Sequence, residues 1–163
     1  MTEGIKSKIW LFNDNVNTDQ ILPSQYLLMN SVDQMKQYAF EPIEKDFSKL
    51  ACEGDIIVAG NNFGCGSSRE QAPMVLKALG IKAIIACSFA MIFFRNAINI
   101  GLPVLICDEL NNNVKTGDIL EADVRNGIIK FNNKSFSCAK LPENIMNILD
   151  AGGLINYVNN AVK

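Results

Sequence analysis

Histidine is absent from this chain of 163 residues, and its absence removes several classes of chemistry at once. A chain without imidazole cannot itself form a Ser-His-Asp or Cys-His catalytic group, and it offers no histidine ligand to a metal ion. Any acid or base on this chain must therefore be a different side chain.

A surplus of positive charge is also lacking. Lysine and arginine number 15 and aspartate and glutamate 17, which gives a formal net charge of −2 at pH 7. Proteins that hold a nucleic-acid backbone neutralise its phosphates with clustered basic residues, so we expect no nucleic-acid partner. Hydrophobic residues make up 48% of the chain, which excludes a disordered protein and suits one buried core.

Paired cysteines and long hydrophobic segments are missing as well. The five cysteines are odd in number and widely spaced, with no CxxC pair, so neither a disulfide framework nor a usual metal-ligand pattern is present. The apolar, uncharged run at residues 83–94 has 12 residues, whereas a membrane-spanning helix needs about 20. The first residues contain no signal-peptide core. We therefore expect reduced cysteines, no membrane association and a cytoplasmic location.

Strand-like and helix-like patterns alternate along most of the chain. Apolar, β-branched runs predict strands at 8–12, 55–59, 83–87 and 103–107. Helices are expected at 69–79, 90–100, 142–149 and from 154 onward. Short alternating runs predict an antiparallel meander at 118–124, 127–131 and 134–138. Residues 24–49 are interpreted as a long loop with helical pieces, one of them at 32–40.

This order of elements predicts a single α/β domain over residues 1–163. The middle of the chain reads strand, loop, helix, strand, helix, strand, which is typical of a parallel or mixed sheet covered by helices. The antiparallel meander would follow at the C-terminal side of that sheet, and a chain of this length is usually one domain.

The sequence GNNFGCGSSREQAP, residues 60–73, is the richest in chemical possibilities. Gly64 and Gly66 allow a tight turn and close approach of the backbone to a ligand. Ser67 and Ser68 are expected at the start of a helix, where free backbone N–H groups favour an anion. Arg69 adds a planar cation suited to a carboxylate or phosphate. The segment therefore predicts an anion site, in which a serine alkoxide would be stabilised.

A purely structural role is the alternative for the same residues. A serine at the helix start, supported by Glu70, would form an ordinary N-terminal cap. Neither the GxxxxGK[ST] phosphate loop nor GxGxxG is present, so no nucleotide is indicated. The residues alone lead no further than an anion site.

Three blocks, NTDQILPSQYL at 17–27, NNFGCGSSREQAP at 61–73 and SFAMIFFRNAINIGLP at 88–103, follow one another along the chain. Together they resemble the small subunits of the isopropylmalate isomerase and homoaconitase group, in which the swivelling domain of the aconitase superfamily is a separate chain. The resemblance covers nearly the whole sequence, and GCGSSRE is its most specific part.

The resemblance implies a hydro-lyase that dehydrates and isomerises a hydroxy-dicarboxylate, as in leucine biosynthesis. A large partner subunit would hold a [4Fe–4S] cluster, and this chain, in a heterodimer or heterotetramer, would close over the site without binding a metal itself. By the same resemblance, Ser67 would be the general base that removes a proton α to a carboxylate. Ser68 and Arg69 would bind a substrate carboxylate.

Asp19 matches the family's Thr-Asp pair at the cleft, which implies that it also binds substrate, with simple turn geometry as the alternative. Gly64, Cys65 and Gly66 would supply the backbone of the motif. The cysteines are expected to be small buried apolar residues rather than cluster ligands. Cys65 is the expected exception, because it lies in the motif loop.

Substrate choice in this family is attributed to the loop that begins at Tyr26. The loop comprises Tyr26, Leu27, Leu28, Met29 and Asn30. No arginine occurs between residues 24 and 49, so a third carboxylate would be left unpaired, which argues against citrate and homocitrate. Isopropylmalate is the first expectation, and 2,3-dimethylmalate or a citramalate-type substrate is the alternative.

Two residues depart from the resemblance within the matched blocks. Gln71 stands where many relatives have histidine, and Met91 stands where arginine is common. These departures leave a related enzyme with a different hydroxy-acid substrate as an alternative. A stand-alone anion-binding or regulatory module that has lost its partner is the alternative from a different class.

Overall fold

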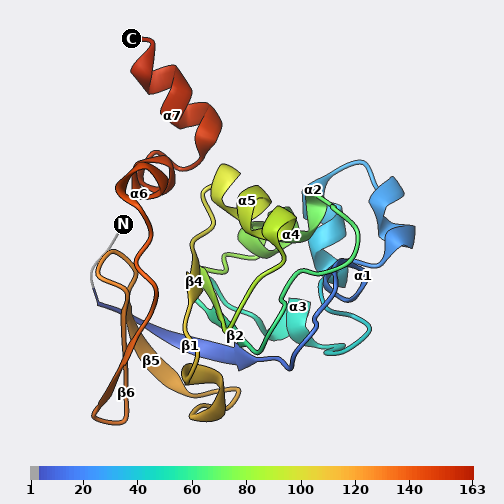
Figure 1. The fold of residues 1–163 in the computed structure, drawn as a ribbon. Helices are drawn as coiled ribbons and strands as arrows, with labels where there is room; N and C mark the ends of the chain where they lie inside the picture. The colour runs from blue at the N-terminus through green and yellow to red at the C-terminus, as the bar shows by residue number, and fades with distance from the viewer. Residues whose placement is uncertain (1–3) are drawn as a thin grey trace.

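Seven strands form one mixed sheet in the computed structural model, which describes residues 4–163 (Figure 1). The strands are β1 (Ile5–Leu11), β2 (Ile56–Ala59), β3 (Ala83–Ala86), β4 (Val104–Ile106), β5 (Ile119–Asp123), β6 (Ile128–Phe131) and β7 (Lys134–Ser137). Their order across the sheet is β4-β3-β2-β1-β5-β6-β7. Strands β1 to β4 are parallel, and β5 to β7 pair in an antiparallel manner. The predicted α/β class with its C-terminal meander is confirmed.

Helices cover the parallel half of the sheet. The longer ones are α4 (Gln71–Ala78), α5 (Met91–Asn99), α6 (Glu143–Asp150) and α7 (Leu154–Ala161). The shorter ones are α1 (Thr18–Ile21), η1 (Ser24–Leu28), α2 (Val32–Met35), η2 (Lys36–Tyr38), α3 (Phe47–Leu50) and η3 (Leu110–Asn112). Figure 1 shows α4 and α5 side by side above the sheet, with α1 and α2 at one end and α6 at the other. None of the helices within residues 4–163 is both long and apolar enough to cross a membrane.

The sheet is buried on both faces of its parallel half, which explains the continuous apolar runs in the sequence. Alternate residues point to opposite sides, so Ile57 and Ala59 enter the core under α4 and α5, while Ile56 and Val58 enter a second core. The second core lies inside the curl of the sheet. The chain after β7 returns to β4, where the N–H of Ala139 donates to the carbonyl oxygen of Ile106 at 2.8 Å.

Residues 24–49 are held by aromatic packing rather than by regular structure. The expected helix at 32–40 is present only as α2 followed by η2. Phe40 and Phe47 are fully buried, and the Phe40 ring stacks on Phe12 with 4.2 Å between ring centroids. The interpretation as a long loop with helical pieces is therefore confirmed, and the loop packs against Phe12, the residue after β1.

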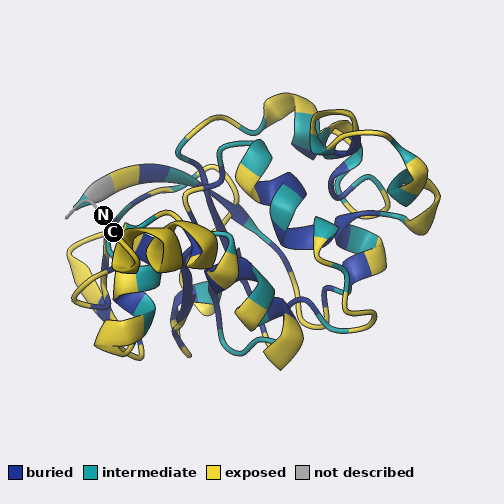
Figure 2. Cartoon of the chain, turned by 90° about the horizontal axis from the view of Figure 1, so that it is seen from above, coloured by how far each residue is buried: buried dark blue, intermediate teal, exposed yellow. Residues whose placement is uncertain are grey.

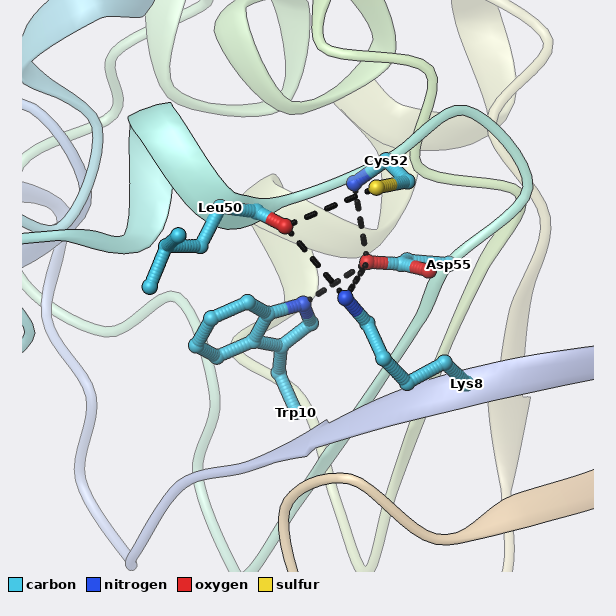
Figure 3. Close-up of polar contacts among 5 residues, drawn as sticks. All are labelled: Lys8, Trp10, Leu50, Cys52 and Asp55. Atoms are coloured by element: carbon cyan, nitrogen blue, oxygen red, sulfur yellow. Dashed lines mark hydrogen bonds and ion pairs between the residues drawn. The ribbon is translucent and has the colours of Figure 1, made fainter.

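A buried carboxylate ties β1 to the segment that leads into β2 (Figure 3). Asp55 accepts hydrogen bonds from the Trp10 indole N–H and from the backbone N–H of Cys52, both at 2.9 Å. The Lys8 ammonium lies 3.3 Å from the same carboxylate oxygen and also donates to the carbonyl oxygen of Leu50. Burying a carboxylate without partners is costly, and these three donors offset that cost. Asp55 therefore links β1 to the segment before β2.

Candidate functional site

The three blocks that the sequence singled out meet at the carboxyl ends of β1, β2 and β3. Parallel strands end at the same edge of a sheet, so the loops that follow them converge there. Two isolated parallel bridges, Asn17 with Cys65 and Phe63 with Phe89, continue the pairing beyond the strands. The backbone N–H of Gly64 donates to the carbonyl oxygen of Val16 at 2.7 Å. The loops that follow β1, β2 and β3 are thus neighbours at one edge of the sheet, although they are far apart in the sequence.

The motif loop depends on its glycines. Gly64 has φ +81°, and a Cβ built on it would lie 2.2 Å from Cγ of Phe93. Any larger residue would therefore collide with α5 as well as strain the backbone. Gly66 has φ +91°, but there the nearest atoms to a built Cβ are 3.6 Å away, so only the backbone angle requires glycine.

The prediction that a helix begins at Ser67 and Ser68 is wrong. Helix α4 starts at Gln71, and Glu70 before it makes no side-chain capping bond, so the alternative of a serine cap is wrong as well. The motif loop is not part of α4, and hydrogen bonds from the neighbouring turn fix it instead. Pro73 was the available signal, because proline fits the first turn of a helix but not its interior. The free amides of α4 therefore begin four residues after Ser67.

Both serines of the motif are exposed at the surface. Neither hydroxyl group hydrogen-bonds to another group in residues 4–163, so both are open to a ligand. The Ser67 carbonyl oxygen, in contrast, accepts two hydrogen bonds, one from the backbone N–H of Arg69 at 2.8 Å and one from the Thr18 hydroxyl at 2.9 Å.

Arg69 and Asp19 are brought into direct contact. One guanidinium nitrogen of Arg69 lies 2.5 Å from a carboxylate oxygen of Asp19 and donates to the carbonyl oxygen of Leu22 at 3.1 Å. The arginine side chain is 15% exposed and that of Asp19 is 61% exposed. The observed partner of Asp19 is therefore Arg69, which lines the hollow described below, whereas Asp19 itself is not among its lining residues.

A capping box fixes the turn that carries Asp19. The Asn17 side chain accepts from the backbone N–H of Gln20 at 2.9 Å, and the Gln20 side chain accepts from the backbone N–H of Asn17 at 3.0 Å. The carbonyl oxygen of Cys65 in turn accepts from the backbone N–H of Thr18 at 2.9 Å. Helix α1 is therefore a short, well-braced support beside the motif loop.

An open hollow of about 220 Å³ lies between this turn, the motif loop and the beginning of α5. Its lining residues from the turn and motif are Thr18, Gly64, Gly66, Ser67, Ser68 and Arg69, and those from the α5 region are Ala90, Met91, Ile92, Phe93 and Asn96. One side is thus polar and cationic, and the other is largely apolar. Such a surface suits a small molecule with a carboxylate at one end and an alkyl group at the other.

Sequence reasoning missed several residues of this hollow. Thr18, Ile92 and Asn96 were not singled out, and Met91 was noted only as a departure from relatives. The signal that identifies their region is topological: Ala90 and Met91 follow the carboxyl end of β3, next to the loop that follows β2.

The segment expected to set substrate choice lies outside the lining of the hollow. Its first three residues lie in η1, where Leu28 is 89% exposed, and its last two follow that helix. The Tyr26 ring stacks on Tyr38 at 3.8 Å, and its hydroxyl group donates to Glu41 at 2.5 Å. That hydrogen bond to the carboxylate raises the pKa of Tyr26 above its ordinary value.

The cysteines do not gather into a metal centre within residues 4–163, where no cluster of three potential ligands occurs. Cys107 and Cys138 are buried as expected, but Cys52 is exposed. Cys65 is half-buried in the motif loop. The five thiols therefore occupy very different environments, and only two behave as core residues.

Comparison with known proteins adds independent findings. Residues 14–109 match the family model of the aconitase C-terminal domain. The 3-isopropylmalate dehydratase small subunit of Hydrogenobaculum sp. is 52% identical over 156 residues, which cover 94% of each chain. The isopropylmalate/citramalate isomerase small subunit of Methanocaldococcus jannaschii is 47% identical over 160 residues, covering 97% of this chain and 95% of that relative. A crystal structure of 3-isopropylmalate dehydratase from the same organism superposes with a TM-score of 0.91 at 44% identity, covering 97% of this chain and 95% of the other.

Proposed function

The chain belongs to the family of 3-isopropylmalate dehydratase small subunits, hydro-lyase components with the aconitase C-terminal domain, and we propose that it acts on isopropylmalate. In this proposal it works in the cytoplasm, in leucine biosynthesis, and only together with a large subunit. The observation that carries the proposal is the hollow that has Ser67 and Arg69 on one side and apolar residues of α5 on the other.

Ser67 is the proposed general base. Its exposed hydroxyl group is free of hydrogen bonds within residues 4–163 and lines the hollow, where it would take the proton α to a substrate carboxylate. A serine is a weak base in water, so its alkoxide needs nearby positive charge. Because α4 begins at Gln71, that support comes from Arg69 rather than from the end of the helix.

Arg69 and Ser68 are the proposed carboxylate ligands. A guanidinium group offers five N–H donors, and those not used by Asp19 and Leu22 remain for the substrate. Asp19 acts in this proposal by holding the arginine against the motif loop. A planar, bidentate donor also fixes the orientation of the carboxylate, which places the neighbouring carbon toward Ser67.

The apolar part of the substrate is assigned to the α5 side of the hollow. Met91 and Ile92 are exposed apolar side chains there, and they would contact the isopropyl group. Tyr26, Leu27, Leu28, Met29 and Asn30 are proposed to complete this surface in the assembled enzyme. One or two methyl groups change binding by only about 1–3 kcal/mol in such a pocket. Citramalate is therefore the second candidate, which the name of the 47% identical relative also favours.

The iron–sulfur cluster is assigned to the large subunit. The thiols of this chain are spread over separate elements, and no three potential ligands come together in residues 4–163. When bound, a [4Fe–4S] cluster supplies a Lewis acid for the substrate hydroxyl group. This chain would contribute the base and a carboxylate site, and a heterodimer or heterotetramer would enclose the substrate between the two subunits.

Anaerobic reconstitution with the large subunit tests the proposal. The complex is assayed for hydration of isopropylmaleate, dimethylmaleate and citraconate, with the native chain and with Ser67→Ala. We expect isopropylmaleate to give the highest kcat/KM and Ser67→Ala to reduce kcat strongly. Full activity of Ser67→Ala would disprove the base assignment. A chain that binds dicarboxylates but supports no turnover would instead be an anion-binding module.

A further inference from the structure

We propose that Thr18 is a positioning residue for Ser67, acting through the backbone of the motif loop. The inference rests on the proposed role of Ser67 as the base and adds a residue to which no role has been assigned. Its hydroxyl group donates to the carbonyl oxygen of Ser67 at 2.9 Å. The two residues are 49 positions apart, so this bond joins the turn after β1 to the loop after β2.

The Ser67 carbonyl is fixed from two directions. It accepts from the Thr18 hydroxyl and from the backbone N–H of Arg69 at 2.8 Å. A carbonyl with both lone pairs engaged has little freedom to rotate, and its orientation sets the peptide plane between Ser67 and Ser68. The same plane determines where the Ser67 side chain projects into the hollow.

Side-chain packing does little to fix the loop at this point. Gly66 precedes Ser67, and a Cβ built on it would make only ordinary contacts with Asn17 and Thr18, at 3.6 Å. Because glycine has no side chain and adopts more backbone conformations than other residues, Gly66 does not by itself fix the position of Ser67. The Ser67 side chain itself is exposed. Hydrogen bonds to the backbone, rather than packing, therefore set the position of the hydroxyl group of Ser67.

Thr18 is well placed to provide this restraint. It is 2% exposed and begins α1, and its own backbone N–H donates to the carbonyl oxygen of Cys65 at 2.9 Å. Burial and β-branching limit its side chain to few rotamers. The threonine is thus a rigid donor attached twice to the motif, once on each side of Gly66.

The test compares Thr18→Val and Thr18→Ser in the holoenzyme reconstituted with the large subunit. Valine preserves the shape but removes the donor, whereas serine keeps the donor. We expect Thr18→Val to lower kcat by about three- to tenfold, the size of one hydrogen bond, with KM changed less than about twofold. Thr18→Ser should restore most of kcat. Thr116→Val, which removes the hydroxyl that accepts from the backbone N–H of Leu11, is the matched control and should leave kcat unchanged.

A double mutant separates positioning from general stability. If Thr18 acts through Ser67, Thr18→Val should cause no further loss of kcat in a Ser67→Ala enzyme. Wild-type kcat in Thr18→Val, or the same loss in both backgrounds, would overturn the inference. Failure of the proposed function has a different signature: Ser67→Ala itself would then be fully active.

Discussion

Arg69 is restrained at its guanidinium group by a carbonyl oxygen and a carboxylate, and lysine cannot reproduce that geometry. A lysine ammonium is a point charge and could not bind Asp19, Leu22 and a substrate carboxylate in one plane. We expect Arg69→Lys to raise KM and lower kcat together, so that kcat/KM falls by about 10- to 100-fold. Steady-state kinetics of the reconstituted holoenzyme measures this.

Arg95→Lys provides the control for this substitution. Arg95 lies exposed on α5, outside the lining of the hollow, so the change from guanidinium to ammonium should be kinetically silent. If Arg69→Lys were as silent as Arg95→Lys, Arg69 would not bind the carboxylate.

Substitution of Asp55 tests how much the buried polar contacts between β1 and the segment before β2 contribute to stability. Asp55→Ala would leave the Trp10 N–H and the Cys52 N–H without their acceptor and Lys8 without its counter-charge. Buried donors that lose their partners are costly, so the free energy of unfolding should fall by about 2–4 kcal/mol. Urea denaturation measures the loss.

Asp33→Ala is the comparison for Asp55→Ala. Asp33 is an exposed carboxylate that forms an ion pair with Lys36 three residues on, and such surface pairs contribute about 0–1 kcal/mol. Equal losses of unfolding free energy from the two substitutions would mean that the buried contacts of Asp55 contribute no more than a surface ion pair.

At the scale of elements, the approach of the motif loop to α5 is the contact most sensitive to substitution. Gly64→Ala must accept both a strained φ and a Cβ that collides with the Phe93 ring. Gly117→Ala has the same strain at φ +96° but no atom within 4 Å of the new Cβ. The two variants therefore differ by the collision alone, which costs about 1–3 kcal/mol.

We expect Gly64→Ala to be less stable than Gly117→Ala by that amount in urea denaturation. It should also lower kcat in the holoenzyme, because the motif loop must shift away from α5. A Gly64→Ala protein as stable as Gly117→Ala would contradict the close packing seen here.

The elements most predictable from sequence are those whose pattern is local. Strands β2 and β3 were placed within a residue because apolar runs between glycines and polar residues define them without reference to the rest of the chain. The start of α4 differs from the prediction because hydrogen bonds from the turn at residues 16–18 hold residues 64–67 in a loop, and a local pattern does not reveal those bonds. Pro73, the third residue of α4, is the one local signal for the later start. The family motifs predict Ser67, Arg69 and Asp19 as site residues, whereas the proposal for Thr18 required the fold.

For the whole molecule, the sheet separates the site from the rest of the domain. The parallel strands bring three loops to one edge, while the antiparallel strands curl away and close against β4 through Ala139 and Ile106. The meander therefore encloses the second core without contributing to the hollow. This division explains why the informative sequence blocks all lie before residue 104, whereas the last third is recognisable only as structure.

Helix α7 contributes no residue to either core, so its removal should change the stability of the domain little. Figure 1 shows it extending away from the molecule, and Figure 2 shows it almost entirely as exposed surface. None of its residues is buried, whereas α6 buries Met146 and Leu149 in the core. The free energy of unfolding of a chain that ends at Gly153 should therefore lie within about 1 kcal/mol of that of the full-length protein.

A chain that ends at Leu141 is the comparison. It loses α6 with its two core side chains, each of which contributes about 2–5 kcal/mol when truncated, so it should be strongly destabilised or fail to fold. Urea denaturation of the three proteins measures the difference. Because the fold needs α6 and leaves α7 exposed, equal losses from the two truncations would mean that α7 packs against the domain in solution, contrary to its position here.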